Sequence, residues 1–155
     1  MVKPASALHW AVNRRTLLAT LGAGGLAATA GCTSVLGRDD SPCGGNDCQV
    51  GMTRNAFVPE TYEVTAGETV VWKNTSGADH TATAYGDAIP DEATYFATGG
   101  YGSEGTARDA WFEERGGALR PRETFSHTFD VPGSYEYLCI PHERAGMVGE
   151  IIVSE

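Results

Sequence analysis

From residue 50 onward, the chain alternates short runs of β-branched and aromatic residues with turns that contain Gly or Pro. These runs occupy residues 62–65, 69–74, 124–129, 135–138 and 149–153. Several short strands separated by turns predict an antiparallel all-β sandwich or barrel. The length of 155 residues fits one such domain with a core of its own.

Residues 87–119 break this pattern. Thr106 and Asp109 form a capping pair ahead of the apolar residues 110–112, and Gly116-Gly117 provides a C-terminal stop. We therefore predict one short helix inside a long inserted loop.

The first 31 residues read as an export signal. Arg14 and Arg15 precede an apolar stretch that runs to about Gly31. At roughly 16 residues, this stretch is shorter than the ~20 residues that span a bilayer. A basic start, a short apolar middle and a small-residue end are typical of a signal peptide. The arginine pair resembles the twin-arginine type, whose pathway exports folded proteins.

Two sites could end this signal. Ala28-Thr29-Ala30 would release a secreted, soluble protein, whereas Thr29-Ala30-Gly31-Cys32 resembles a lipobox in which Cys32 becomes a lipid anchor. We favour the anchor, which predicts attachment to the outer face of the cell membrane.

Residues 32–49 read as a flexible linker, because they are rich in Gly, Ser and Asp and lack apolar periodicity. Cys43 and Cys48 lie within this segment, and in an exported protein such a pair indicates a small disulfide loop. The predicted organisation is thus a signal at 1–31, a linker at 32–49 and one domain at 50–155.

The charge of the chain is strongly acidic, with 20 Asp and Glu against 11 Lys and Arg and a net charge of -9. Three of the basic residues, Lys3, Arg14 and Arg15, lie in the expected signal, so the remainder has a net charge near -12. Such a surface repels phosphate backbones, which excludes nucleic acid as a partner.

Metal-binding side chains gather near the C-terminus. Cys139, His142 and Met147 fall within one loop between two predicted strands, and His80 follows the predicted strand 69–74. Thiolate and thioether favour Cu(I), imidazole also accepts Cu(II), and a His₂Cys site with a weak axial Met serves both oxidation states. We therefore predict one copper ion bound by these four residues.

Two other residues of similar chemistry have structural interpretations. His127 alternates onto the face of Phe125 and Phe129, and Met52 lies in the first strand, so we expect both to support the core.

The ligand spacing also carries a family resemblance. Cys-x₂-His-x₄-Met, an upstream His and the closing Gly-Met-x-Gly-x-Ile-x-Val strand resemble the cupredoxins of the plastocyanin group. Finer details resemble the halocyanins, the small blue copper proteins of salt-loving archaea: residues 79–81, 88–91, 96–100 and 126–129. The twin-arginine signal and the acidic, lysine-poor body also resemble that family.

The resemblance implies a Greek-key β-sandwich of cupredoxin type with a type 1 copper ion on His80, Cys139, His142 and Met147. It implies a monomeric electron carrier between membrane redox complexes. His142 is then expected near the surface, among Pro141, Ala145 and Gly146, with electrons passing through its ring edge.

Other functions fit the residues less well. A metal hydrolase needs an open coordination position and a general base, and four protein ligands leave no vacancy. A copper-storing or copper-delivering lipoprotein is the main alternative, although such proteins favour Met-rich or His-rich clusters. Only Met52 and Met147 remain after the expected signal. We therefore expect an electron carrier and not an enzyme.

Overall fold

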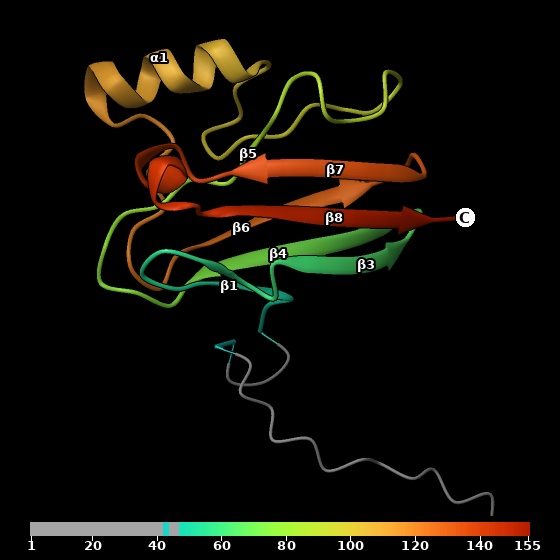
Figure 1. Ribbon diagram of the computed structural model, residues 1–155, viewed down its shortest axis with the longest axis horizontal. Coiled ribbons are helices and arrows are strands. Elements are labelled where there is room, and N and C mark those ends of the chain that lie inside the picture. The colour runs from blue at the N-terminus through green and yellow to red at the C-terminus, as the bar shows by residue number, and fades with distance from the viewer. Residues whose placement is uncertain (1–41, 44–46) are drawn as a thin grey trace, which may run out of the picture. The chain divides into compact units, whose positions relative to one another are not determined.

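The computed structural model describes residues 42–43 and 47–155. The expected signal, Cys32 and most of the expected linker lie outside these residues. Within them, eight strands form two four-stranded sheets that enclose a common core, as Figure 1 shows. The predicted β-sandwich is confirmed.

The first sheet has the spatial order β2 (Phe57–Val58), β1 (Val50–Met52), β4 (Glu68–Asn74) and β6 (Thr124–Phe129). The second has the order β3 (Thr61–Thr65), β8 (Val148–Ser154), β7 (Gly133–Leu138) and β5 (Thr83–Ala84). Strands β2 and β5 have two residues each, too short to show a periodic pattern in the sequence.

The expectation of a purely antiparallel fold is wrong for two strand pairs. Strand β1 pairs in parallel with β4, and β3 pairs in parallel with β8, whereas the other four pairs are antiparallel. The chain leaves the first sheet to form β3 before it returns as β4. Because of this crossing between sheets, two strands of one sheet can run in the same direction.

Large side chains fill the space between the sheets. Trp72 of β4 is fully buried, with ring centroids of Tyr137 at 5.5 Å and Phe96 at 5.7 Å from its own. Met52 is also buried in this cluster, as predicted. The half-buried His127 stacks on Phe96 at 4.9 Å, which agrees with its structural interpretation.

The long insertion is part of the core. The amide of Ala84 donates to the carbonyl of Phe96 at 3.0 Å, and the amide of Thr98 donates to that of Ala82 at 2.9 Å. These bonds extend β5 with a second, irregular segment. The Phe96 side chain, 2% exposed, packs among the aromatic rings between the sheets.

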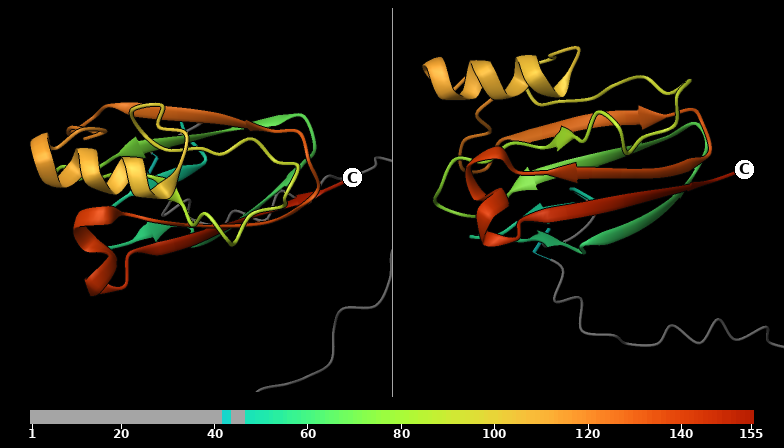
Figure 2. Two further views of the ribbon diagram at one scale, coloured as in Figure 1. Left: turned by 90° about the horizontal axis from the view of Figure 1, so that it is seen from above. Right: turned by 45° about the horizontal axis from the view of Figure 1, so that its top comes forward.

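The predicted helix within the insertion is α1, which spans Glu104–Glu114 and is the only α-helix of the described residues. Its N-cap is Ser103, whose hydroxyl accepts from the amide of Thr106 at 3.3 Å. The predicted capping pair of Thr106 and Asp109 is therefore wrong, because the helix begins earlier and Thr106 already lies in its first turn. Figures 1 and 2 place α1 at the same end of the sheets as the coil that follows β7.

The helix ends directly before the predicted glycine stop. Arg115 adopts a left-handed conformation with φ 58°, and the amide of Gly116 donates to the carbonyl of Ala110 at 2.9 Å. Gly117 has φ 74°, and the carbonyl of Thr98 occupies the space that a Cβ there would need. Glycine at 117 therefore permits the chain to turn back across the insertion.

Two further observations concern the N-terminal part of the described chain and the membrane. Cys43 and Cys48 form a disulfide, with their Cα atoms 5.4 Å apart, and both are buried. The amide of Gln49 donates to the carbonyl of Val71 in β4 at 2.9 Å, so the described end of the expected linker packs on the domain and is not flexible linker. Among the described residues, no helix has the length and apolar character needed to span a bilayer.

Candidate metal centre

The segment after β4 carries His80 into the interior. The His80 amide donates to the carbonyl of Leu119 at 3.1 Å, and the Leu119 amide donates to the carbonyl of His80 at 2.8 Å. These two bonds fix the backbone of His80 against the end of the long insertion. Its side chain is fully buried.

A buried amide, Asn74, organises the turn that leads to His80. Its Nδ2 donates to the carbonyls of Ala78 at 2.7 Å and Leu119 at 2.8 Å. Its Oδ1 accepts from the amide of Ser76 at 2.9 Å and lies 3.0 Å from the Ser76 hydroxyl. That hydroxyl lies 2.8 Å from Nε2 of His80, so the network continues from the backbone to the imidazole ring.

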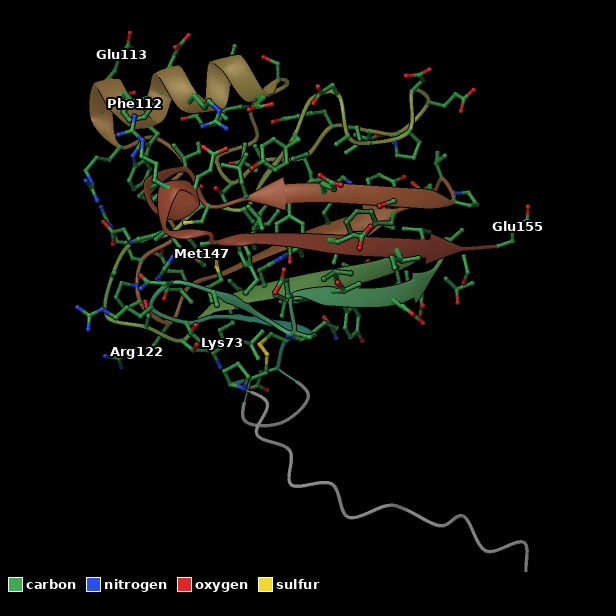
Figure 3. The ribbon with its side chains drawn as sticks, in the orientation of Figure 1. Lys73, Phe112, Glu113, Arg122, Met147 and Glu155 are labelled. Atoms are coloured by element: carbon green, nitrogen blue, oxygen red, sulfur yellow. A yellow bond between two sulfur atoms is a disulfide. The ribbon has the colours of Figure 1, made fainter. Side chains whose placement is uncertain are left out.

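The other three predicted ligands lie around one short coil. Cys139 follows β7, and its amide donates to the carbonyl of Met147 at 3.0 Å, which closes the loop at its base. Between them, η1 (Ile140–Ala145) is a 3₁₀ helix with Pro141 in its first turn. Figure 3 shows the labelled Met147 beside this coil, and Met147 is fully buried.

Three donor atoms converge in this interior. Nδ1 of His80 lies 3.4 Å from Sγ of Cys139, and Nδ1 of His142 lies 3.3 Å from the same sulfur. Ligand atoms of all three residues lie within 4.8 Å of one another, and no other such group occurs in the described ranges. Both imidazoles thus turn the same nitrogen toward the thiol, and the Nε2 of His80 is left to Ser76.

The sulfur of Cys139 also receives a backbone hydrogen bond. The amide of Thr81 donates to it at 3.4 Å, while the Thr81 hydroxyl accepts from the amide of Ile140 at 2.8 Å. Thr81 therefore ties the His80 segment to the Cys139 loop at the sulfur itself. Sequence analysis could not predict this contact, because Thr81 and Cys139 are brought together only by the pairing of β5 with β7.

The electrostatics of the site keep both imidazoles neutral. Burial, together with the nearby His142, lowers the pKa of His80 to about 4 against a smaller opposing effect of Asp79. Burial also lowers the pKa of His142 and raises that of the Cys139 thiol to about 11. Neutral imidazoles are ready to bind a metal, whereas the thiol must release its proton when a metal binds.

An ion pair joins the ligand loop to α1. Arg108 donates to Glu143 through Nη1 at 2.7 Å and Nη2 at 3.0 Å, and through Nε to Glu104 at 2.8 Å. The Tyr85 hydroxyl donates to Glu143 at 2.9 Å. Because Glu143 follows His142 directly, these bonds position the backbone that carries this ligand.

The surroundings of His142 are asymmetric. His142 and Pro141 are half-buried, whereas Ala145 and Gly146 are exposed, as is Arg144. His80, Cys139 and Met147 lie behind them with no exposed surface. His142 is therefore the ligand that connects the site with the outside, as the family resemblance implied.

The donor set fits copper. Two imidazole nitrogens and one thiol sulfur converge, and a buried thioether lies on the same loop. Thiolate and thioether would favour Cu(I) and imidazole would also accept Cu(II), so these four residues would hold copper in both oxidation states. Together with the β-sandwich, this set defines the class of type 1 copper electron carriers, the cupredoxins. His80, Cys139, His142 and Met147 are the copper ligands.

Comparison with known proteins agrees with that class. Residues 46–154 match the family described as copper binding proteins of the plastocyanin/azurin family. The chain belongs to the plastocyanin/azurin family. It functions as an electron carrier and not as an enzyme.

Individual relatives align with between about two thirds and nearly all of this chain. Plastocyanin of Vicia faba is 36% identical over 99 residues, which cover 64% of this chain and 88% of the relative. Chloroplastic plastocyanin of Chlamydomonas reinhardtii is 32% identical over 156 residues, which cover 98% and 90% of the two chains. Among solved structures, amicyanin from Paracoccus versutus is 24% identical and has a TM-score of 0.48, with 68% of this chain and 78% of that chain covered.

Proposed function

We propose that this chain is a halocyanin-type carrier that moves single electrons between redox complexes of a cell membrane. The segments that support the halocyanin type are Asp79-His80-Thr81, Ala88-Ile89-Pro90-Asp91 and Ser126-His127-Thr128-Phe129, together with the acidic composition. The predicted source is a salt-loving archaeon. The carrier acts as a monomer.

The proposed location rests on the N-terminal sequence. The twin-arginine signal at 1–31 exports the folded domain, Cys32 carries a lipid, and the linker that follows Cys32 tethers the domain at the outer face of the membrane. Mass spectrometry of the mature protein tests this. A lipid-modified N-terminal Cys32 is expected, and an unmodified N-terminus at Gly31 would instead indicate a secreted, soluble protein.

One observation carries the electron-transfer function: the two Nδ1 atoms already converge on Sγ, with His80 and Cys139 fully buried and His142 half-buried. Bound copper supplies a one-electron couple between Cu(I) and Cu(II). The chain holds the His80 imidazole through Ser76 and the backbone beside His142 through Glu143, and the buried Met147 helps to exclude water. Little has to move when the charge of the site changes, so transfer can be fast.

Absorption spectroscopy of the copper-loaded chain tests this function. An intense blue band from thiolate to Cu(II) is expected, and Cys139→Ser should abolish it. His127→Gln is the matched control, since it changes an imidazole outside the site and should keep the band. Reversible one-electron voltammetry then separates a carrier from a copper-storing or copper-delivering lipoprotein. A colourless Cu(II) form would contradict the proposal.

A further inference from the structure

A groove of about 600 Å³ separates α1 from the loop that holds three of the copper ligands. Residues of α1 and its C-terminal turn form one wall, and residues on both sides of His142 form the other. Its lining consists of Arg108, Trp111, Phe112, Arg115, Ile140, Pro141, Glu143 and Arg144. A molecule that binds in this groove therefore contacts the loop that carries His142.

The groove has an apolar centre. Trp111 and Ile140 are 5% and 7% exposed and form its base. Phe112 is 75% exposed, while the next most exposed large apolar side chain of the described residues, Ile152, reaches 37%. Figure 3 shows Phe112 at the end of the helix above the ligand coil, whereas Glu113 points away from the sheets. An aromatic ring this exposed, beside an apolar base, is typical of a contact surface.

The charge of the groove differs from that of the chain. Three of its lining residues are arginines and one is a glutamate, although the chain as a whole has a net charge of -9. Arg108 is paired with Glu143 and Glu104, and Arg115 lies 4.5 Å over the Trp111 ring with Asp79 at 3.6 Å. Arg144 is exposed and makes no salt bridge within the described ranges.

We propose that this groove docks a redox protein whose contact face combines an apolar centre with carboxylates at its edge. This inference rests on the electron-transfer function proposed above and names the face that the partner uses. Charge complementarity selects such a partner, because Arg144 and the partly exposed Arg115 attract carboxylates while the acidic remainder of the chain repels them. A symmetric contact between two copies would place arginine-lined groove against arginine-lined groove, so a second copy is disfavoured.

Two small probes test the two halves of the surface on the full, Cu(I)-loaded chain at low ionic strength. Hexacyanochromate(III), a paramagnetic trianion, should broaden the amide NMR signals of residues around Arg144 and Arg115 first. The dye 8-anilinonaphthalene-1-sulfonate, which joins aromatic rings to an anion, should bind at the groove. Its affinity should fall roughly fivefold in Arg144→Gln and in Phe112→Ser. Arg54→Gln and Ile152→Ser are the matched controls, since neither residue lines the groove and both should leave the affinity unchanged.

The outcomes separate this proposal from the function on which it rests. Broadening centred on another face, or dye binding that is equal in all four variants, would overturn the docking site while the blue band and reversible voltammetry persist. Loss of reversible voltammetry in the unchanged chain would instead refute electron transfer. A dimer in sedimentation equilibrium that Phe112→Ser dissociates would replace the redox partner with a second copy of the chain.

Discussion

Replacement of Asn74 should weaken both the fold and the metal site, although this residue is not a ligand. Its side chain is fully buried and connects three segments: the end of β4, the turn at 76–78 and the backbone of Leu119. The last of these pairs with His80. Asn74→Ala removes all of these connections at once.

The magnitude follows from the hydrogen bonds. The carboxamide takes part in four contacts of 2.7 to 3.0 Å, and a typical intramolecular hydrogen bond contributes about 1 kcal/mol. The carbonyls of Ala78 and Leu119 keep one other partner each, Ser76 Oγ and the His80 amide, so neither is left unpaired. We therefore expect a loss of about 4 kcal/mol in the free energy of unfolding, with no added penalty for an unpaired carbonyl. Asn74→Asp should cost at least as much, because it turns a buried carboxylate oxygen toward two carbonyls.

Urea denaturation of the metal-free protein measures this loss, and the visible spectrum of the Cu(II) form reports on His80. The blue band should weaken or shift in Asn74→Ala, because Ser76 loses the contacts that hold its hydroxyl on the imidazole. Thr75→Ala is the control in the same turn: it removes one bond, to the carbonyl of Met52, and should cost about 1 kcal/mol with no spectral change. Equal losses in the two variants would refute the reasoning.

Three other changes test different parts of the molecule. Phe96→Ala should reduce the free energy of unfolding by about 3–5 kcal/mol, since this ring of the insertion is buried in the core; a loss below about 1 kcal/mol in urea denaturation would show that the insertion is dispensable. Glu143→Gln should destabilise the protein by about 1–2 kcal/mol near neutral pH. Arg108 lowers the pKa of Glu143 from its ordinary 4.5, so its contribution is complete above that value and is lost as the pH falls through the lowered pKa. The difference in Tm between the two proteins should therefore shrink in acid, and a constant difference would contradict the ion pair. Met147→Leu keeps the buried volume and removes a weak donor, so voltammetry should show a raised midpoint potential with the blue band retained, whereas an unchanged potential would exclude Met147 as a ligand.

The sequence predicted the longer strands and the metal ligands well, for a physical reason. Residues 69–74 and 124–129 each have one face in the core, and this burial imposes the alternation that can be seen in the sequence. The spacing of Cys139, His142 and Met147 is equally local, because all three lie on one loop closed by the bond between Cys139 and Met147.

The features that the sequence did not predict depend on contacts between distant segments. Thr81 lies just before β5, and only the pairing of β5 with β7 places its amide on the sulfur of Cys139. Arg108 and Glu143 are 35 residues apart, and nothing in either local pattern indicates that they pair. The parallel pairing of β3 with β8 is hidden for the same reason, since strand periodicity specifies the buried face but not the neighbour.

That parallel pairing determines when the domain can close during synthesis. The Ser154 hydroxyl of β8 donates to the carbonyl of Val64 in β3, across a separation of 90 residues. Strand β8 lies between β3 and β7 and pairs with both. One hydrogen-bonding edge of β3 and one of β7 therefore stay unpaired until residues 148–154 have been made. A chain that lacks β8 therefore still contains Cys139 and His142, but it cannot surround them with a finished sandwich. Copper captured by the complete site thus marks a chain whose final strand is in place.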